Sequence, residues 1–131
     1  MTVATIRKNT RRAKSMIQFT TSHPTEDDNL IVVELSGKLD SDTSDLFFAR
    51  LEQEVKKGHT RLIFDCHKLE YISSLGFGMM IRAHSRLQKA GGSVRFARLE
   101  GMLGEAFRVV GFHKLFDNHD SVEAAAASFS E

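Results

Sequence analysis

The sequence predicts a single α/β domain with a mixed, mainly parallel β-sheet of four to five strands, covered by about four α-helices. Short apolar, β-branched segments alternate with amphipathic helical segments, which is the pattern of a sheet layered with helices. Glycines stand at most of the boundaries between these segments. At 131 residues and 41% hydrophobic composition, the chain has room for one domain and enough apolar residues for a core.

The N-terminal segment differs in composition from the rest, so we divide the chain into a basic tail at residues 1–14 and a domain at residues 15–131. The first 25 residues contain no acid, and the cations of the tail are Arg7, Lys8, Arg11, Arg12 and Lys14. Two interpretations are open. The segment is either a solvated tail that leads into the fold or an electrostatic contact for an anionic partner.

The first half of the domain contains two predicted strands and one helix. Met16–Thr21 alternates in hydrophobicity like an edge strand, and His23–Asn29 holds the only proline and predicts a turn. Leu30–Leu35 is a continuous apolar run, typical of a buried strand, and Gly37 is expected to end it. A helix should then run to about Lys57, with candidate N-caps at Asp40, Ser41 and Asp42.

The second half repeats this alternation and ends in helices. We expect, in chain order, a strand at Arg61–Asp65, a loop at Cys66–Ser74, a helix at Leu75–Ala90, a strand at Ser93–Ala97, a helix at Gly101–Val110 closed by a left-handed Gly111, and a last helix begun by Asp120 with Glu123. Together the elements predict one layer of sheet and one of helices.

The helix after the loop is expected to turn one face to the sheet. At about 100° per residue, the inward set comprises Phe77, Met80, Ile81, His84 and Leu87. The outward set comprises Leu75, Gly78, Met79, Arg82 and Arg86. We therefore predict exposed apolar side chains beside the start of this helix.

Composition and spacing argue against several functions. A formal net charge of +1 is too balanced for a dedicated nucleic-acid binder. No stretch approaches the roughly 20 apolar residues that span a bilayer, and no secretory signal is evident, so we expect a cytoplasmic protein without membrane insertion. The single cysteine, Cys66, excludes an internal disulfide and a cysteine-based zinc site, although its thiol could be exposed after a strand.

No cofactor is expected either. His113 and His119 lack a supporting cluster of metal ligands. The stretch Gly76-Phe77-Gly78 lacks the Gly-Lys-Ser/Thr of a phosphate loop, and Ile81 stands where a dinucleotide fingerprint needs glycine. Catalytic chemistry therefore has no visible centre in the sequence.

The hydroxyls of two serines at the start of the predicted helix are the remaining candidates for a functional site. Serine is a preferred N-cap, so either Ser73 or Ser74 can serve the helix alone. Gly76 and Gly78, however, each weaken the first turns by roughly 0.5–1 kcal/mol relative to alanine. That weakness is tolerable where another backbone or an active site must approach, which favours a docking site around a modifiable serine.

Three segments resemble the STAS domain family, in particular the bacterial anti-sigma factor antagonists. They are LSGKLDSDTSDLF at 35–47, LIFDCHKLEYISSLGFGMMI at 62–81 and VGFHKLFDNHDSVEAAAASF at 110–129, in the order and spacing of the family. The resemblance extends from about Met16 to Phe129. It implies a single STAS domain that acts by binding partners and not as an enzyme.

The resemblance also implies a switch. In the family, a serine at this helix start is phosphorylated by an anti-sigma factor that is also a serine kinase of the GHKL type, and a serine phosphatase reverses the modification. The matching acceptor here is Ser74, with Ser73 as the alternative because many members have aspartate at that position. Asp40 and Asp65 match acidic positions near the acceptor. Together with the outward face of the predicted helix, this gives a predicted partner surface of Asp40, Ser73, Leu75, Gly76, Gly78, Met79 and Arg82.

Two other outputs remain open for a domain of this family. The chain could be the STAS subunit of a lipid-transport ABC complex, or a phospho-switch for an output other than a sigma factor.

Overall fold

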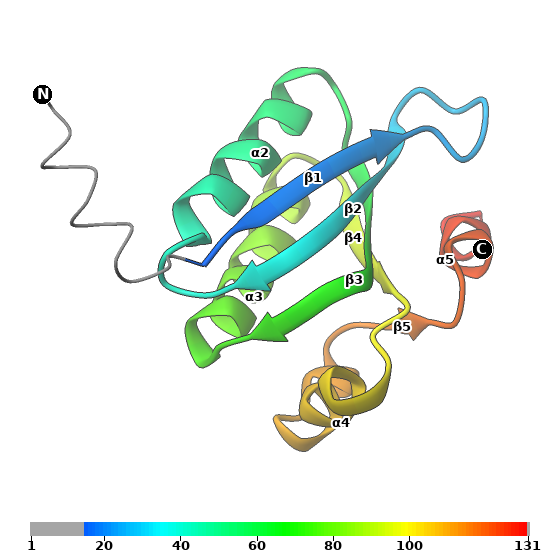
Figure 1. The fold of residues 1–131 in the computed structure, drawn as a ribbon. Helices are drawn as coiled ribbons and strands as arrows, with labels where there is room; N and C mark the ends of the chain where they lie inside the picture. Colours follow the sequence, from blue (N-terminus) through cyan, green and yellow to red (C-terminus); the bar gives the residue numbers. More distant parts are fainter. Residues whose placement is uncertain (1–14, 131) are drawn as a thin grey trace, which may run out of the picture.

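The structure, a computed structural model, describes residues 15–130 (Figure 1). The predicted tail, residues 1–14, lies outside this range. The elements are β1 (Ile17–Ser22), β2 (Leu30–Leu39), α2 (Ser44–Lys56), β3 (Arg61–Ile72), α3 (Ser74–Lys89), β4 (Ser93–Ala97), α4 (Gly101–Val109), a 3₁₀ turn (Phe112–Lys114), β5 (Asn118–His119) and α5 (Val122–Ser128). The α/β class and the single domain are confirmed.

The five strands form one sheet in the order β1-β2-β3-β4-β5. β1 pairs antiparallel with β2, whereas β2 with β3, β3 with β4, and β4 with β5 are all parallel. The predicted mixed, mainly parallel sheet is thus confirmed. Because β1 runs against β2, the start of β1 lies at the same end of the sheet as the last residues of β2 and β3.

The main core lies between the sheet and three helices, and phenylalanines fill much of it. Phe64 of β3 contacts Phe47 of α2 and Phe96 of β4, with ring centroids 5.2 and 5.7 Å apart. Phe107 of α4 extends this cluster, with its ring centroid 6.3 Å from that of Phe96. Burial of these large side chains against each other supplies the main stabilisation of the domain.

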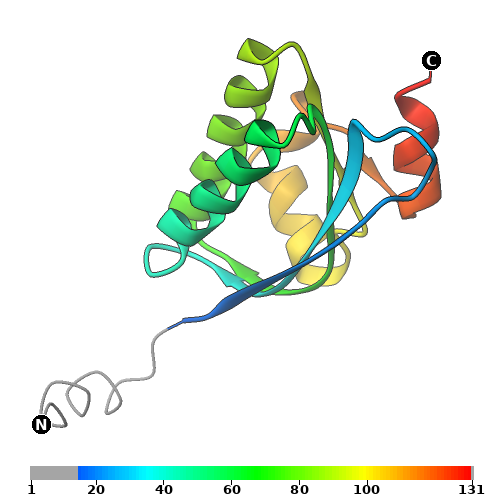
Figure 2. The ribbon, with the colours of Figure 1, turned by 90° about the horizontal axis from the view of Figure 1, so that it is seen from above.

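The expectation of one helical layer is wrong for α5. A second apolar cluster joins Ala125 and Ala126 of α5 to side chains on the opposite face of the sheet, among them Val32 and Ile63. Figure 2 shows α2 and α3 on one side of the sheet and α5 on the other. The continuous apolar run of β2 is explained by this arrangement, since both of its faces are covered.

The two central strands are longer than predicted. Gly37 does not end β2: it continues the strand with φ at +105°, and a β-carbon there would collide with the backbone oxygen of Met16. The segment predicted as a loop after Asp65 is the second half of β3, paired with β2 as far as Leu39 and Ile72. Irregular register between Glu34 and Lys38 interrupts the alternation of buried and exposed residues, so the pattern did not reveal these extensions.

Helix starts were predicted less well than helix ends. α2 begins at Ser44 after Thr43, so Asp40 and its neighbours form the preceding turn and not the cap. α5 is capped by the Ser121 hydroxyl, which accepts from the amide of Ala124, and not by Asp120. The left-handed Gly111 after α4 is confirmed, with φ at +84°. β5 was missed because two residues carry no strand signal.

Candidate functional site

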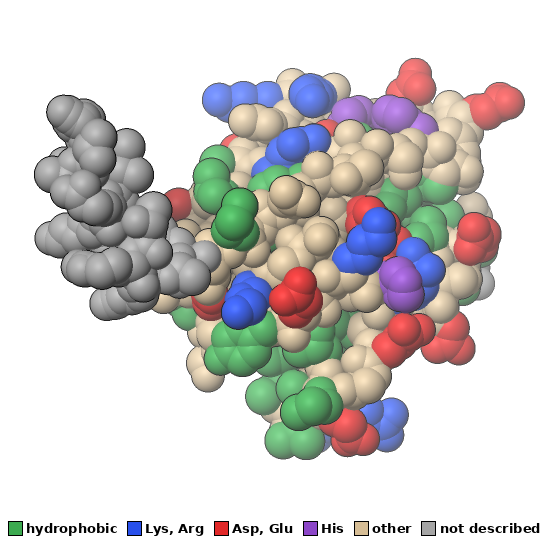
Figure 3. Space-filling model, in the orientation of Figure 1, with side chains coloured by type: hydrophobic (Ala, Val, Ile, Leu, Met, Phe, Trp, Pro, Cys, Tyr) green, Lys and Arg blue, Asp and Glu red, His purple; other side chains and the backbone are tan. Residues whose placement is uncertain are grey.

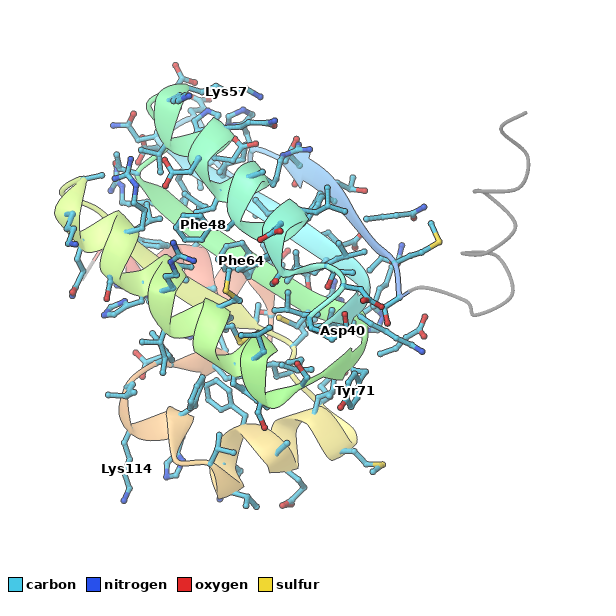
Figure 4. All side chains as sticks on the ribbon, turned by 90° about the vertical axis from the view of Figure 1, so that its left-hand side faces the viewer. Asp40, Phe48, Lys57, Phe64, Tyr71 and Lys114 are labelled. Atoms are coloured by element: carbon cyan, nitrogen blue, oxygen red, sulfur yellow. The ribbon has the colours of Figure 1, made fainter. Side chains whose placement is uncertain are left out.

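The site is the end of the sheet where β2 and β3 give way to the first turns of α2 and α3. The amide of Ser73 donates to the carbonyl oxygen of Leu39 at 3.0 Å, which joins the end of β3 to the end of β2. Asp40 follows Leu39 directly, so the Asp40 turn and the start of α3 are neighbours. Figure 4 shows Asp40 at this end, with Tyr71 of β3 nearby.

The two serines at the start of α3 have different surroundings. Ser73 is the N-cap: its hydroxyl accepts from the amide of Gly76 at 3.0 Å. Ser74 is the first helical residue and is exposed, and within the described part of the chain its hydroxyl makes no hydrogen bond. Capping therefore occupies Ser73 and leaves the Ser74 hydroxyl open to a partner.

The two glycines near the start of α3 also differ in their surroundings. A β-carbon on Gly76 would meet the carbonyl of Leu39 and lie 2.9 Å from Cγ2 of Ile72, closer than real side chains pack. A β-carbon on Gly78 would meet nothing within 4 Å. Gly76 is thus required by the fold, whereas packing does not require Gly78. Gly78 is four residues after Ser74 and so lies on the same face of the helix. Because glycine has no side chain, the surface beside the Ser74 hydroxyl is open.

The predicted orientation of α3 is wrong for two residues. Met79 is buried, with 6% of its surface exposed, although it was expected to face outward; Ile81 is 40% exposed, although it was expected in the core. The buried face of α3 is turned by about 60° from the predicted one, because α2 packs beside this helix. Leu75, at 48% exposure, and Gly78 do face solvent as predicted.

Contacts between the two helices show where the predicted arginines lie. Arg86 forms an ion pair with Glu52 of α2, with Nε 2.7 Å from Oε2. The guanidinium carbon of Arg82 lies 4.3 Å from the ring centroid of Phe48. Arg82 is exposed, but its guanidinium is already stacked on an aromatic ring of its own chain.

Ser74, Gly78 and Ile81 form the surface that we call the outer stripe of α3.

Asp40 holds the turn before α2 and the start of β1. Its carboxylate accepts from the amide of Asp42 at 3.0 Å, and its carbonyl accepts from the amide of Ser44 at 2.9 Å. A hydrogen bond from Ser15 is the largest of the causes that lower the pKa of the Asp40 carboxyl. The amide of Ser15 also donates to Oδ2 of Asp42 at 3.2 Å. Sequence reasoning missed this role of Asp42, which depends on residues 27 positions apart.

Asp65 does not lie near the acceptor, in contrast to the expectation from family position. Asp65 is seven positions before Ile72, which places it about 23 Å from that end of β3. Its buried carboxylate instead pairs with Arg98, at 3.0 and 2.7 Å. Arg98 adopts φ at +62°, uncommon for a residue with a side chain, and its amide donates to the carbonyl of His119 at 2.8 Å.

The remaining chemical candidates do not assemble. Cys66 is buried and not exposed, and burial raises the pKa of its thiol, so it is a poor nucleophile. His84 is half-buried as expected, with its ring edge on Phe116. His113 and His119 line a cleft of about 680 Å³ beside α4. Among residues 15–130, no group of three or more histidine, cysteine or acidic side chains could hold a metal ion.

Exposed apolar side chains continue the surface near the start of α3. Tyr71 is half exposed at the end of β3, and Met102 at the start of α4 is almost fully exposed. Figure 3 shows hydrophobic side chains over α4 and over the adjoining end of β3. No helix within residues 15–130 is long and apolar enough to cross a membrane. An exposed apolar surface beside a free hydroxyl is suited to protein docking.

Comparison with known proteins identifies the family. The sequence model described as the STAS domain matches residues 22–125. The chain belongs to the STAS domain family. Its sequence is 31% identical over 102 residues to BtrV of Bordetella bronchiseptica, which carries the name of an anti-sigma factor antagonist. That match covers 78% of this chain and 88% of BtrV.

Solved structures of this STAS fold include further anti-sigma factor antagonists. One from Mycobacterium paratuberculosis gives a TM-score of 0.75 at 18% identity, covering 88% of this chain and 96% of that one. SpoIIAA in its unphosphorylated form gives 0.68 at 18% identity, covering 87% and 98%. The phosphorylated form of this Bacillus cell fate determinant gives 0.63 at 18% identity, covering 86% and 99%. The chain is thus an anti-sigma factor antagonist-like STAS domain.

Proposed function

We propose that this STAS domain is a cytoplasmic binding protein whose docking to an anti-sigma factor is switched by reversible phosphorylation of Ser74. The proposed kinase is the anti-sigma factor itself, of the GHKL type, and a serine phosphatase restores the free hydroxyl. The observation that carries the proposal is the division of labour at the start of α3. Ser73 caps the helix while the Ser74 hydroxyl is exposed and has no hydrogen-bond partner within residues 15–130.

The surroundings of Ser74 support access by a kinase. Gly78 removes any side chain from the next turn of the outer stripe, and exposed Leu75 supplies an apolar contact beside the hydroxyl. A protein surface can therefore close on the serine without displacing packed side chains. The modified form of SpoIIAA, which shares this fold, shows that a STAS domain can exist in a phosphorylated state.

The location of Ser74 also explains how a phosphate could block docking and leave the fold intact. A phosphate at a helix N-terminus meets the free amides of the first turn and the positive end of the helix dipole. It adds about −1.5 to −2 charges close to Asp40 and Asp42. To dock, a partner surface shaped for a neutral serine must then remove water from the phosphate and from the carboxylates of like charge beside it.

The required effect is within reach of this chemistry. Reducing a complex from near saturation to about 1% occupancy takes about 5.5 kcal/mol of differential binding. A desolvated charge without a partner at the centre of an interface costs several kcal/mol. One phosphate, with the neighbouring carboxylates, would therefore supply several of the kcal/mol that the switch needs.

Incubation with the anti-sigma kinase of the same organism and ATP, followed by peptide mass spectrometry, tests the proposal. We expect a single phosphate on Ser74. Ser74→Ala should bind the kinase whether or not ATP is present, and Ser74→Asp should bind poorly. Ser73→Ala is the matched control, since it removes the neighbouring hydroxyl and should keep the switch.

Two results would overturn the proposal. Phosphate on Ser73 alone would reassign the acceptor. A kinase that binds the chain but leaves it unmodified would exclude the switch, and copurification with an ABC-type ATPase would then favour the lipid-transport interpretation.

A further inference from the structure

The outer side of β1 is an open edge of the sheet. β1 stands first in the strand order and pairs only with β2 (Figure 1). The amide of Lys38 donates to the carbonyl oxygen of Met16 at 2.8 Å, which fixes where hydrogen-bonded pairs fall in this antiparallel ladder. Because such pairs alternate with non-bonded ones, three residues of β1 direct their N–H and C=O groups away from β2. They are Ile17, Phe19 and Thr21, and their outward groups make no hydrogen bond in the described part of the chain.

This edge lacks the features that usually protect an open strand. The sequence of Ile17–Ser22 contains no charged residue and no proline, and its six residues pair with β2 without a register shift. Apolar side chains flank it: Met16 is 68% exposed, and Leu46 of α2 is 57% exposed. Leu46 lies one helical turn before Arg50, whose guanidinium carbon is 5.7 Å from the ring centroid of Phe19. An unprotected edge of this kind is suited to accept a further strand.

The strand is complementary to a second copy of itself. When two copies run antiparallel with Phe19 opposite Phe19, Ile17 of each copy stands opposite Thr21 of the other. Each of these three residue pairs then exchanges two backbone hydrogen bonds, so every outward-facing group of β1 is satisfied. The two phenylalanine rings become cross-strand neighbours on the core side, and on the other face Gln18 stands opposite Thr20.

Charges near the edge favour the antiparallel arrangement. Arg50 forms an ion pair at 3.0 Å with Glu54, which is fully buried, so its charge is balanced within each copy. The loop after β1 contains exposed Glu26 and Asp28, and exposed Lys38 lies beside the start of β1. Antiparallel strands bring this acidic loop of one copy to the end of the other copy where Lys38 lies. A parallel arrangement would instead place the two acidic loops together.

We propose that the free edge of β1 pairs antiparallel with β1 of a second copy of this chain, joining the two sheets into one continuous sheet. The pairing leaves both Ser74 residues accessible, because α3 packs on β3 and β4 while β1 lies beyond β2. The proposal therefore does not depend on phosphorylation. Two short strands form a small interface, so the dimer is expected to be weak and reversible.

Sedimentation velocity over a concentration series, up to about 1 mM because the interface is small, tests the pairing. We expect the native chain to shift from monomer to dimer over the series. Thr21→Pro removes an outward N–H that β2 does not use, so the fold should tolerate it. The loss of two N–H donors per dimer should raise the Kd at least about tenfold. Thr21→Val is the matched control, since it keeps the N–H and should dimerise like the native chain.

A charge exchange tests the same interface at side chains that the fold does not bury. Gln18→Lys combined with Thr20→Lys places like charges opposite each other across the proposed dimer, and should also raise the Kd at least about tenfold. Gln18→Glu combined with Thr20→Glu should do the same. An equimolar mixture of the two double variants should dimerise at least as well as the native chain. Thermal unfolding of each variant confirms that it is folded, and this exchange decides the question if Thr21→Pro is not.

A spin label at Ser22→Cys measures the register. Cys66 is buried and should stay unlabelled. With Phe19 at the centre, the two α-carbons at position 22 are separated by about 20 Å along the paired strands, whereas parallel pairing would bring them to about 5 Å. Pulsed electron paramagnetic resonance distinguishes the two arrangements.

Three results would overturn the proposal. A chain that stays monomeric throughout the series would reject self-pairing and leave the edge to an extended segment of another protein. A dimer that survives both Thr21→Pro and the paired lysines would have its interface elsewhere. A dimer in which the labels at position 22 lie at any distance other than the antiparallel one would contradict the register.

Discussion

The inner and outer sides of the first turn of α3 contain the same two residue types in different surroundings. On the inner side, Ser73 caps the helix and Gly76 allows it to lie against Leu39. On the outer side, Ser74 and Gly78 contact nothing that the fold requires. Serine and glycine therefore serve structure on one side and are free for partner recognition on the other, and burial alone decides which.

The sharpest test of this comparison is a charge placed on each side of α3. Met79→Asp should lower the free energy of unfolding by about 4 kcal/mol, because it puts an unpaired carboxylate into the core. Ile81→Asp, on the outer stripe, should lower it by less than about 1 kcal/mol. Urea denaturation followed by circular dichroism measures both. Equal losses would mean that the helix is rotated differently.

Alanine at the two glycines should have opposite effects on stability. Gly76→Ala should cost about 2–3 kcal/mol in the same assay, because its β-carbon has no room against the Leu39 carbonyl and Ile72. Gly78→Ala is the control, with the same change in the same helix. If Gly76→Ala retains native stability, the close approach of α3 to β2 does not require glycine at position 76.

The two serines should separate in the same way, by a smaller amount. Ser73→Ala should reduce the free energy of unfolding by about 1 kcal/mol, since the Gly76 amide loses its acceptor. Ser74→Ala should change it by no more than about 0.5 kcal/mol. Thermal unfolding of the two variants side by side measures this, and a greater loss for Ser74→Ala would exchange the roles assigned to the two hydroxyls.

A small gain in stability, rather than a loss, is expected at Gly78. Gly78→Ala should raise the free energy of unfolding by about 0.5–1 kcal/mol, because alanine is the better helix former and has open space there. The same variant should bind the anti-sigma kinase more weakly, since its methyl group stands beside Ser74. Calorimetric titration against the kinase checks binding, and unchanged affinity would place the partner surface elsewhere.

The candidate site was predicted from sequence where its signals are local. The serine pair, the two glycines and exposed Leu75 all lie within the six positions that follow Ile72. The roles of Met79 and Ile81 were exchanged because helical periodicity defines a stripe but not which neighbouring elements cover it. Here α2 covers one flank of α3, through Phe48 and Glu52.

Asp65 was misplaced for a related reason. Its distance from Ser74 depends on whether the intervening segment folds as a compact loop or an extended strand. That segment is a strand only because β2 continues beside it past Gly37, where the register is irregular. No property of the seven residues between Asp65 and Ser73 taken alone distinguishes these outcomes as clearly as the pairing does.

The sequence by itself determined the order of strands and helices and the positions of several helix ends, because backbone limits act on each residue separately. Gly111, for example, adopts a positive φ that few other residues tolerate. Only the tertiary structure decided that Ser15, Asp40 and Ser74 meet at one end of the domain. That meeting follows from antiparallel pairing of β1 and from the register that joins Leu39 to Ile72, and both depend on contacts between residues far apart in the chain.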